Sequence, residues 1–143
     1  EFREGDWLAP LAGETFDLIA TNPSQMPTPP EHGWEDAQAR ADNGGADGWA
    51  LLGPIIERAP AYLNPGGRLV FTLFGFLGVS RALSRLARAG LRGAVLVREE
   101  QPFPRLARER LPYLRRLGMQ DDAALPPGCP GTCERLVLSA EKG

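Results

Sequence analysis

The stretch that decides the fold is FDLIATNPSQ, residues 16–25. A short apolar run of β-prone residues stops at Asn22-Pro23, which predicts a buried strand over Phe16–Thr21 followed by a rigid turn. Proline fixes the φ angle, so the turn holds the Asn22 side chain and the nearby carbonyl oxygens in place. Ligands of open α/β sheets bind at the carboxyl ends of strands. This turn is therefore the candidate functional site.

A helix is expected after the loop of residues 22–47, which is rich in Pro, Gly, Asp and Glu and has no clean periodicity. From Asp47 onward, apolar residues recur every three to four positions as far as Leu63, as on the buried face of a helix. Asp47 is a candidate N-cap, and Pro60 should end or kink this helix.

The rest of the chain alternates strands with helical patterns, which predicts an α/β sheet. Further strands are expected over residues 68–74, 94–97 and 135–139, and helices over residues 79–89 and, broken at Pro112, 106–117. The strand Phe16–Thr21 has no upstream strand to pair with, so it would lie at an exposed edge. We expect upstream chain or a partner to cover it.

Composition excludes several classes of protein. The 143 residues are 43% hydrophobic and 24% charged with a net charge of −2, as in one ordinary globular domain. This balance gives no support for a broad nucleic-acid footprint. No apolar run approaches the roughly 20 residues that span a bilayer, and two cysteines make no disulfide framework, so a cytoplasmic location is the default expectation.

Four phrases occur in an order that is known from one family. They are Asp6-Trp7, FDLIATNP at residues 16–23, GGADG at residues 44–48 and LNPGG at residues 63–67. Together they resemble the release-factor glutamine N5-methyltransferases, which are class I S-adenosylmethionine-dependent methyltransferases. The resemblance extends to about Val97 and returns at residues 134–139.

The resemblance implies a Rossmann-like sheet that is mostly parallel, with an antiparallel last strand. Residues 1–143 would be the second half of one catalytic domain, carrying its strands four to seven. The glycine-rich cofactor loop that such a domain has after its first strand does not occur in this chain. The chain also starts at Glu1 without methionine, as if within a domain.

The resemblance also implies roles for individual residues. Asn22 and the Pro23 carbonyl would accept hydrogen bonds from the nitrogen to be methylated, which orients its lone pair and stabilises developing positive charge. Asp6 and Trp7 would bind the adenine of S-adenosylmethionine, by hydrogen bonding and stacking, with Asn22 beside the cofactor. The reaction requires no metal and no general base, because the nitrogen loses its proton after the transfer.

The chain departs from the family at the turn itself. The family reads Asn-Pro-Pro followed by an aromatic residue (an NPPY-type motif), whereas this chain places Ser24 and Gln25 after Pro23. Ser24 and Gln25 are candidate substrate-binding residues. N-methylation remains the preferred interpretation, and a protein side chain, a free amino acid or a small metabolite are open as acceptors.

Other interpretations stay open. A nucleic-acid amino-methyltransferase uses a similar turn, although the charge balance disfavours it. A non-catalytic module that pairs with a partner protein would account for the missing glycine loop. Asn22-Pro23 could be a plain strand-ending turn, and Asp6-Trp7 a surface aspartate beside a core tryptophan.

The remaining chemistry-bearing residues favour structural interpretations. His32 lies in the proline-rich loop, where most histidines are solvated. Cys129 and Cys133 lack enough further ligands for a zinc site, which leaves a loop disulfide or two free thiols. The basic stretch Arg105–Arg116 is expected to be a solvated helix face, with a surface for phosphate or an acidic partner as the alternative.

Overall fold

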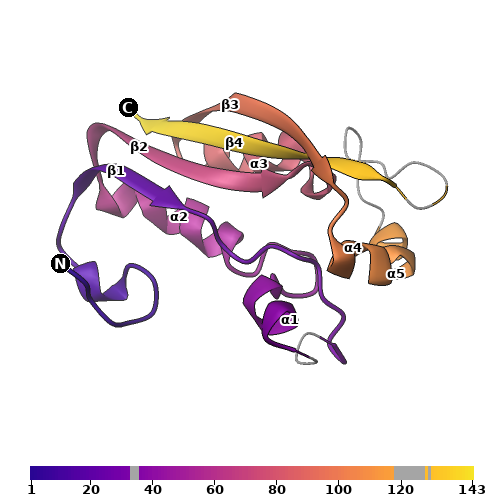
Figure 1. Ribbon diagram of the computed structural model, residues 1–143. Helices are drawn as coiled ribbons and strands as arrows, with labels where there is room; N and C mark the ends of the chain where they lie inside the picture. The colour runs from indigo at the N-terminus through magenta and orange to yellow at the C-terminus, as the bar shows by residue number, and fades with distance from the viewer. Residues whose placement is uncertain (33–35, 118–127, 129) are drawn as a thin grey trace.

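The structure, a computed structural model, describes residues 1–32, 36–117, 128 and 130–143. Its centre is a sheet of four strands, β1 (Phe16–Thr21), β2 (Leu63–Phe74), β3 (Leu91–Pro102) and β4 (Thr132–Lys142), in the order β1-β2-β4-β3. β1 is parallel to β2, and β4 is antiparallel to both β2 and β3. The predicted α/β sheet with an antiparallel last strand is confirmed (Figure 1).

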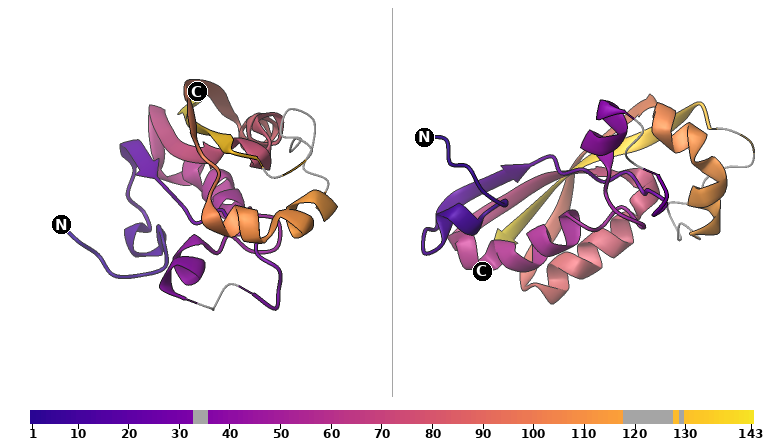
Figure 2. Two further views of the ribbon diagram at one scale, coloured as in Figure 1. Left: turned by 45° about the vertical axis from the view of Figure 1, so that its right-hand side comes forward. Right: turned by 90° about the horizontal axis from the view of Figure 1, so that it is seen from below.

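Two helices cover one face of this sheet. α2 (Leu52–Tyr62) and α3 (Val79–Arg88) lie side by side across it (Figure 2). Along β2 the alternate residues Leu69, Phe71 and Leu73 are buried, because successive side chains of a strand point to opposite faces. They pack with helix residues such as Ile56 and Leu86 into one hydrophobic core.

The opposite face carries no helix within the described residues, and this corrects the prediction that Phe16–Thr21 is buried. Only Ile19 of β1 is buried, whereas Leu18 is 59% exposed. A parallel strand needs cover on both faces to be buried throughout, and here α2 and α3 supply only one. β1 pairs with β2 alone among the described strands, so the predicted edge position is confirmed.

Short elements gather beyond the carboxyl ends of β1 and β2 (Figure 1). These are α1 (Ala37–Asp42), α4 (Arg105–Glu109) and α5 (Leu111–Arg116), while the 3-10 turns η1 (Ala9–Leu11) and η2 (Gly75–Leu77) precede β1 and follow β2. An ion pair of 3.1 Å joins Arg105 to Asp36, the N-cap of α1. The Tyr113 hydroxyl donates to the Ala46 carbonyl at 2.7 Å. The segment around Ala46 and the helices α1, α4 and α5 therefore lie together at the carboxyl ends of β1 and β2, where a ligand is expected.

Several predicted boundaries are wrong. α2 begins at Leu52, so Asp47 is not its N-cap. The helix continues past Pro60 to Tyr62, so it does not end at this proline, and a kink there stays a prediction. The basic segment breaks at Arg110, and Pro112 occupies the first turn of α5, where its missing N–H costs nothing.

Candidate functional site

The Asn22 side chain lies at the carboxyl end of β1 and is held by two residues that the sequence did not single out. Its Oδ1 atom accepts a hydrogen bond from the Thr72 hydroxyl and another, at 2.9 Å, from Nη2 of Arg135. Thr72 is in β2, and the antiparallel register places Arg135 of β4 opposite Phe74. Two signals could have identified these residues. Thr72 is a polar residue within an apolar strand, and Arg135 lies opposite the end of that strand.

A cavity of about 170 Å³ opens beside this turn. It is lined by Asn22, Pro23, Ser24, Gln25, Met26, Ala41, Asp42, Phe74 and Arg135. The structure thus brings four of the predicted site residues, Asn22 to Gln25, to one cavity. The Ser24 hydroxyl donates to the Ala41 carbonyl, which ties the turn to α1.

Gln25 is 3% exposed and braces the turn against β2. Its Oε1 accepts from the Phe74 N–H at 2.7 Å, and its Nε2 donates to the Thr72 carbonyl at 3.1 Å and to the Pro23 carbonyl at 3.3 Å. Both ends of the amide are therefore engaged within the chain. Substrate binding by Gln25 stays a prediction, and the contacts give the residue a supporting role.

Residues 42–48 form the other wall of the turn. The Met26 N–H donates to the Asp42 carbonyl, and the Gly44 N–H donates to the Met26 carbonyl, both at 2.9 Å. A Cβ atom at Gly44 would lie 2.6 Å from the Gln25 backbone. Glycine is required here because two backbone segments touch, which agrees with the interpretation of this phrase as structural.

Asp47 joins that wall to α3. Its carboxylate forms a 2.5 Å ion pair with Arg81 and accepts the Trp49 N–H at 3.1 Å. Burial raises the pKa of the Asp47 carboxyl, but the bonds from Arg81 and the Trp49 N–H outweigh it, so the net pKa lies below its usual value.

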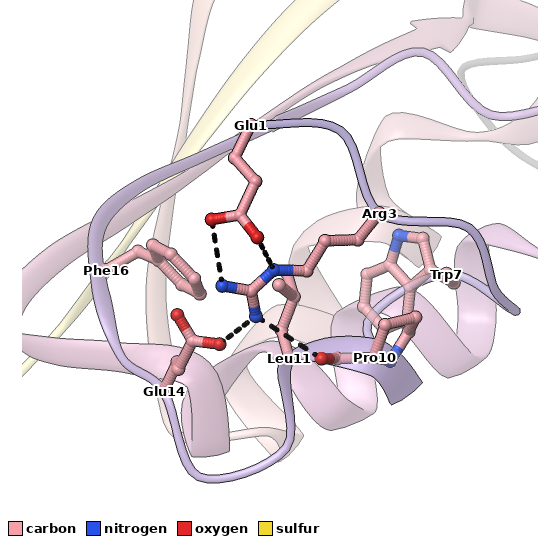
Figure 3. Close-up of a pocket in the computed structure, with 7 residues that line it drawn as sticks. All are labelled: Glu1, Arg3, Trp7, Pro10, Leu11, Glu14 and Phe16. Atoms are coloured by element: carbon pink, nitrogen blue, oxygen red, sulfur yellow. Dashed lines mark hydrogen bonds and ion pairs between the residues drawn. The ribbon is translucent and has the colours of Figure 1, made fainter.

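Asp6 and Trp7 lie at the other end of β1. Trp7 lines a separate pocket of about 370 Å³ with Arg3, Glu14, Phe16 and their neighbours, as Figure 3 shows. The six-residue strand between this pocket and Asn22 spans about 20 Å. Trp7 has a left-handed φ of 50°, which is unfavourable for a bulky residue. The described chain does not bring Asp6 and Trp7 to Asn22, and their cofactor role stays a prediction.

The remaining candidates lie outside the Asn22 cavity. His32 lines a pocket with Asp36, Arg105 and Arg110. Cys133 has a free thiol whose pKa is raised by burial, and Cys129 lies outside the described residues. Arg110 is buried and donates to the Thr28 hydroxyl at 2.8 Å, so the basic stretch is not solvated throughout.

The part of the chain that the structure describes shows neither a cluster of metal ligands nor a helix that could span a membrane. No group of three or more His, Cys, Asp or Glu side chains in this part of the chain is placed to hold a metal ion. No described helix is both long enough and apolar enough to cross a membrane.

Comparisons with known proteins agree with this architecture. No family model matches the chain. Against solved structures, the chain is similar over 99% of its length to the Mtq2–Trm112 complex of E. cuniculi, described as responsible for methylation of the eRF1 translation termination factor. The TM-score is 0.55, the sequence identity 17% and the share of that chain covered 60%. The described sheet and helices therefore share the fold of part of that chain.

Among curated proteins, the chain is similar in sequence to several methyltransferases. The release factor glutamine methyltransferase of Xylella fastidiosa is 43% identical over 75 residues, which cover 48% of this chain and 26% of that protein. The release factor glutamine methyltransferase of Geobacter sulfurreducens is 38% identical over 93 residues, which cover 61% of this chain and 32% of that protein. A putative protein N5-glutamine methyltransferase of Methanocaldococcus jannaschii is 29% identical over 105 residues, which cover 73% of this chain and 53% of that protein.

These matches confirm the resemblance to the release factor glutamine methyltransferases. The chain spans only about a quarter to a half of the length of these relatives.

Proposed function

We propose that this chain forms the acceptor-holding part of an S-adenosylmethionine-dependent N-methyltransferase. The methyl group goes to an amide or amino nitrogen of a protein side chain or a small molecule. The single observation that carries this proposal is the cavity lined by Asn22 to Gln25 at the carboxyl ends of β1 and β2. The names of the relatives support it.

The two oxygens of the turn suit a nitrogen that is a poor nucleophile. An amide nitrogen delocalises its lone pair, and acceptors that hold its hydrogens turn that lone pair toward the methyl group and stabilise the charge that develops. Asn22 Oδ1 and the Pro23 carbonyl are these acceptors. Each already accepts a bond from within the chain, so the substrate must displace a donor or share the oxygen.

S-adenosylmethionine would supply the methyl group, and the nitrogen afterwards releases its proton to water. Trp7 and Asn22 line different pockets, so the described residues do not assemble one cofactor site between them. We therefore assign the residues around the Asn22 cavity to holding the acceptor.

We also propose that upstream chain or a partner protein covers the β1 edge. The strand is unpaired on one side within the described sheet, and Leu18 is 59% exposed beside it. Long apolar edges invite pairing unless something covers them.

The test is Asn22→Ala in a form of the protein that transfers methyl groups, assayed with labelled S-adenosylmethionine and a glutamine-containing peptide. We expect kcat to fall by about 10²–10³ without a change in thermal unfolding, because an oriented acceptor is lost. Asn64→Ala is the matched control, since the Asn64 side chain donates to Asp17 at 2.8 Å, at the start of β1 and away from the cavity. Near-normal transfer by Asn22→Ala would remove Asn22 from the mechanism. If the unsubstituted protein transfers no methyl group, the non-catalytic module becomes the better interpretation.

A further inference from the structure

The guanidinium of Arg135 occupies the place where the proposed acceptor nitrogen would be held. Its Nη2 atom donates to Asn22 Oδ1 at 2.9 Å and lies 3.5 Å from the Thr72 hydroxyl, and its central carbon is 5.4 Å from the centre of the Phe74 ring. The side chain therefore lines the cavity directly beside Asn22 Oδ1.

Arg135 differs from the other arginines of the sheet. Arg68 and Arg92 form ion pairs with Glu141 at 3.0 and 2.6 Å, and Arg98 pairs with Glu134 at 3.0 Å. Within residues 1–32, 36–117, 128 and 130–143, no carboxylate pairs with Arg135. Asp42, the other charged residue of the cavity, accepts a 2.5 Å bond from Gln38.

This arrangement conflicts with methyl transfer unless something moves the guanidinium or neutralises it. The Thr72 hydroxyl and Arg135 together use both lone pairs of Asn22 Oδ1, which leaves none for a substrate N–H. A cation next to a nitrogen that gains positive charge also opposes the reaction, because like charges repel.

We propose that the methyl acceptor carries a carboxylate close to its reactive nitrogen and that Arg135 binds this carboxylate. The inference rests on the proposed function and names its substrate class. Guanidinium and carboxylate match in a two-pronged geometry, so the substrate draws the side chain away from Asn22 Oδ1 and compensates its charge. Asn22 then accepts from the substrate nitrogen. Arg135 is in this way a specificity-determining residue.

Two matched pairs of probes test this with the chain as it is, by calorimetry. The first pair is N-acetyl-L-glutamine and its neutral carboxamide, in which an α-carboxylate is present or absent. The second pair is the capped peptides acetyl-Gly-Gln-Glu-amide and acetyl-Gly-Gln-Gln-amide, in which the charge comes from a neighbouring side chain. Each is measured with the unsubstituted chain, Arg135→Gln, Arg135→Lys and the control Arg98→Gln.

We expect the charged member of one pair to bind at least about tenfold more tightly than its neutral partner. The pair that shows the preference identifies the source of the carboxylate. The preference should vanish in Arg135→Gln, persist in reduced form in Arg135→Lys and remain in Arg98→Gln. Circular dichroism confirms that the variants are folded.

Equal binding of both members of both pairs, no detectable binding of either charged probe, or a preference that survives in Arg135→Gln would each overturn the proposal. The readout is binding and not turnover, so it is distinct from the test of the proposed function. If the protein prefers the charged probes but transfers no methyl group, Arg135 is an anion-binding residue and the proposed methyltransferase function is wrong. If the protein transfers methyl groups but shows no preference for the charged probes, the proposed function stands and the carboxylate site at Arg135 is wrong.

Discussion

The two ends of β1 carry the two phrases that suggested a methyltransferase, and they are built very differently. At the carboxyl end, the Asn22 turn is bonded to β2, β4 and residues 41–44. At the amino end, residues 1–14 place one buried side chain, Leu8, in the core, with Trp7 and Leu11 packed against it, and Phe2 is fully exposed. The ion pairs there, from Arg3 to Glu1 and Glu14, are on the surface.

The Asn22 turn is therefore tied to several neighbouring elements, whereas residues 1–14 have few such ties. The acceptor turn is braced by the amide of the buried Gln25, and loss of that amide is costly because partly buried backbone groups would remain without partners. Exposed ion pairs contribute little and are screened by salt. The acceptor side should therefore be the more rigid of the two ends, and the ion pairs of Arg3 should contribute little to the stability of the chain.

The largest expected effect on stability is that of Gln25→Ala. The substitution would leave the partly buried Phe74 N–H and Thr72 carbonyl without the Gln25 amide, and we expect a loss of about 3 kcal/mol of unfolding free energy. Urea denaturation of the chain measures it. Gln38→Ala, which removes an exposed glutamine bonded to Asp42, is the matched control and should cost less than about 0.5 kcal/mol. Equal losses for the two variants would mean that the turn is not braced as described.

A pair of glycine substitutions compares the two ends directly. Gly44→Ala forces a methyl group to within 2.6 Å of the Gln25 backbone, and we expect a loss of about 2 kcal/mol from overpacking. Gly13→Ala meets open space, and its cost of about 1 kcal/mol comes from the left-handed φ of 87° alone. Thermal unfolding of both variants shows which of the two substitutions lowers the stability more. A larger loss at Gly13 would contradict the tight contact between residues 25 and 44.

The sequence predicted the sheet and the turn because both depend on local signals. The apolar runs at β1 and β2, the Asn22-Pro23 stop and the helical spacing of α2 are each readable within about ten residues. Arg135 and Thr72 were missed because their position depends on strand register, which joins residues 63 positions apart. Asp47 was misread as an N-cap because its ion pair with Arg81, a tertiary contact, was not visible.

The smallest effect we expect depends on pH and concerns Asp47. Because its pKa is lower in the folded chain than in the unfolded chain, the unfolded state binds more protons near pH 4, and stability falls as the pH decreases through that range. Asp47→Asn lacks this contribution. The variant should be less stable than the unsubstituted chain at pH 7, and the difference should shrink as the pH falls through the folded pKa.

Urea denaturation at a series of pH values from 7 downward measures that difference. Glu14→Gln is the control from the amino end, where the ion pair with Arg3 is on the surface and its loss should leave the unfolding midpoint at pH 7 unchanged. A constant gap between Asp47→Asn and the unsubstituted chain at every pH would show that Asp47 stabilises by packing and not by charge. In that case the connection from the turn wall to α3 would not depend on the Asp47–Arg81 ion pair.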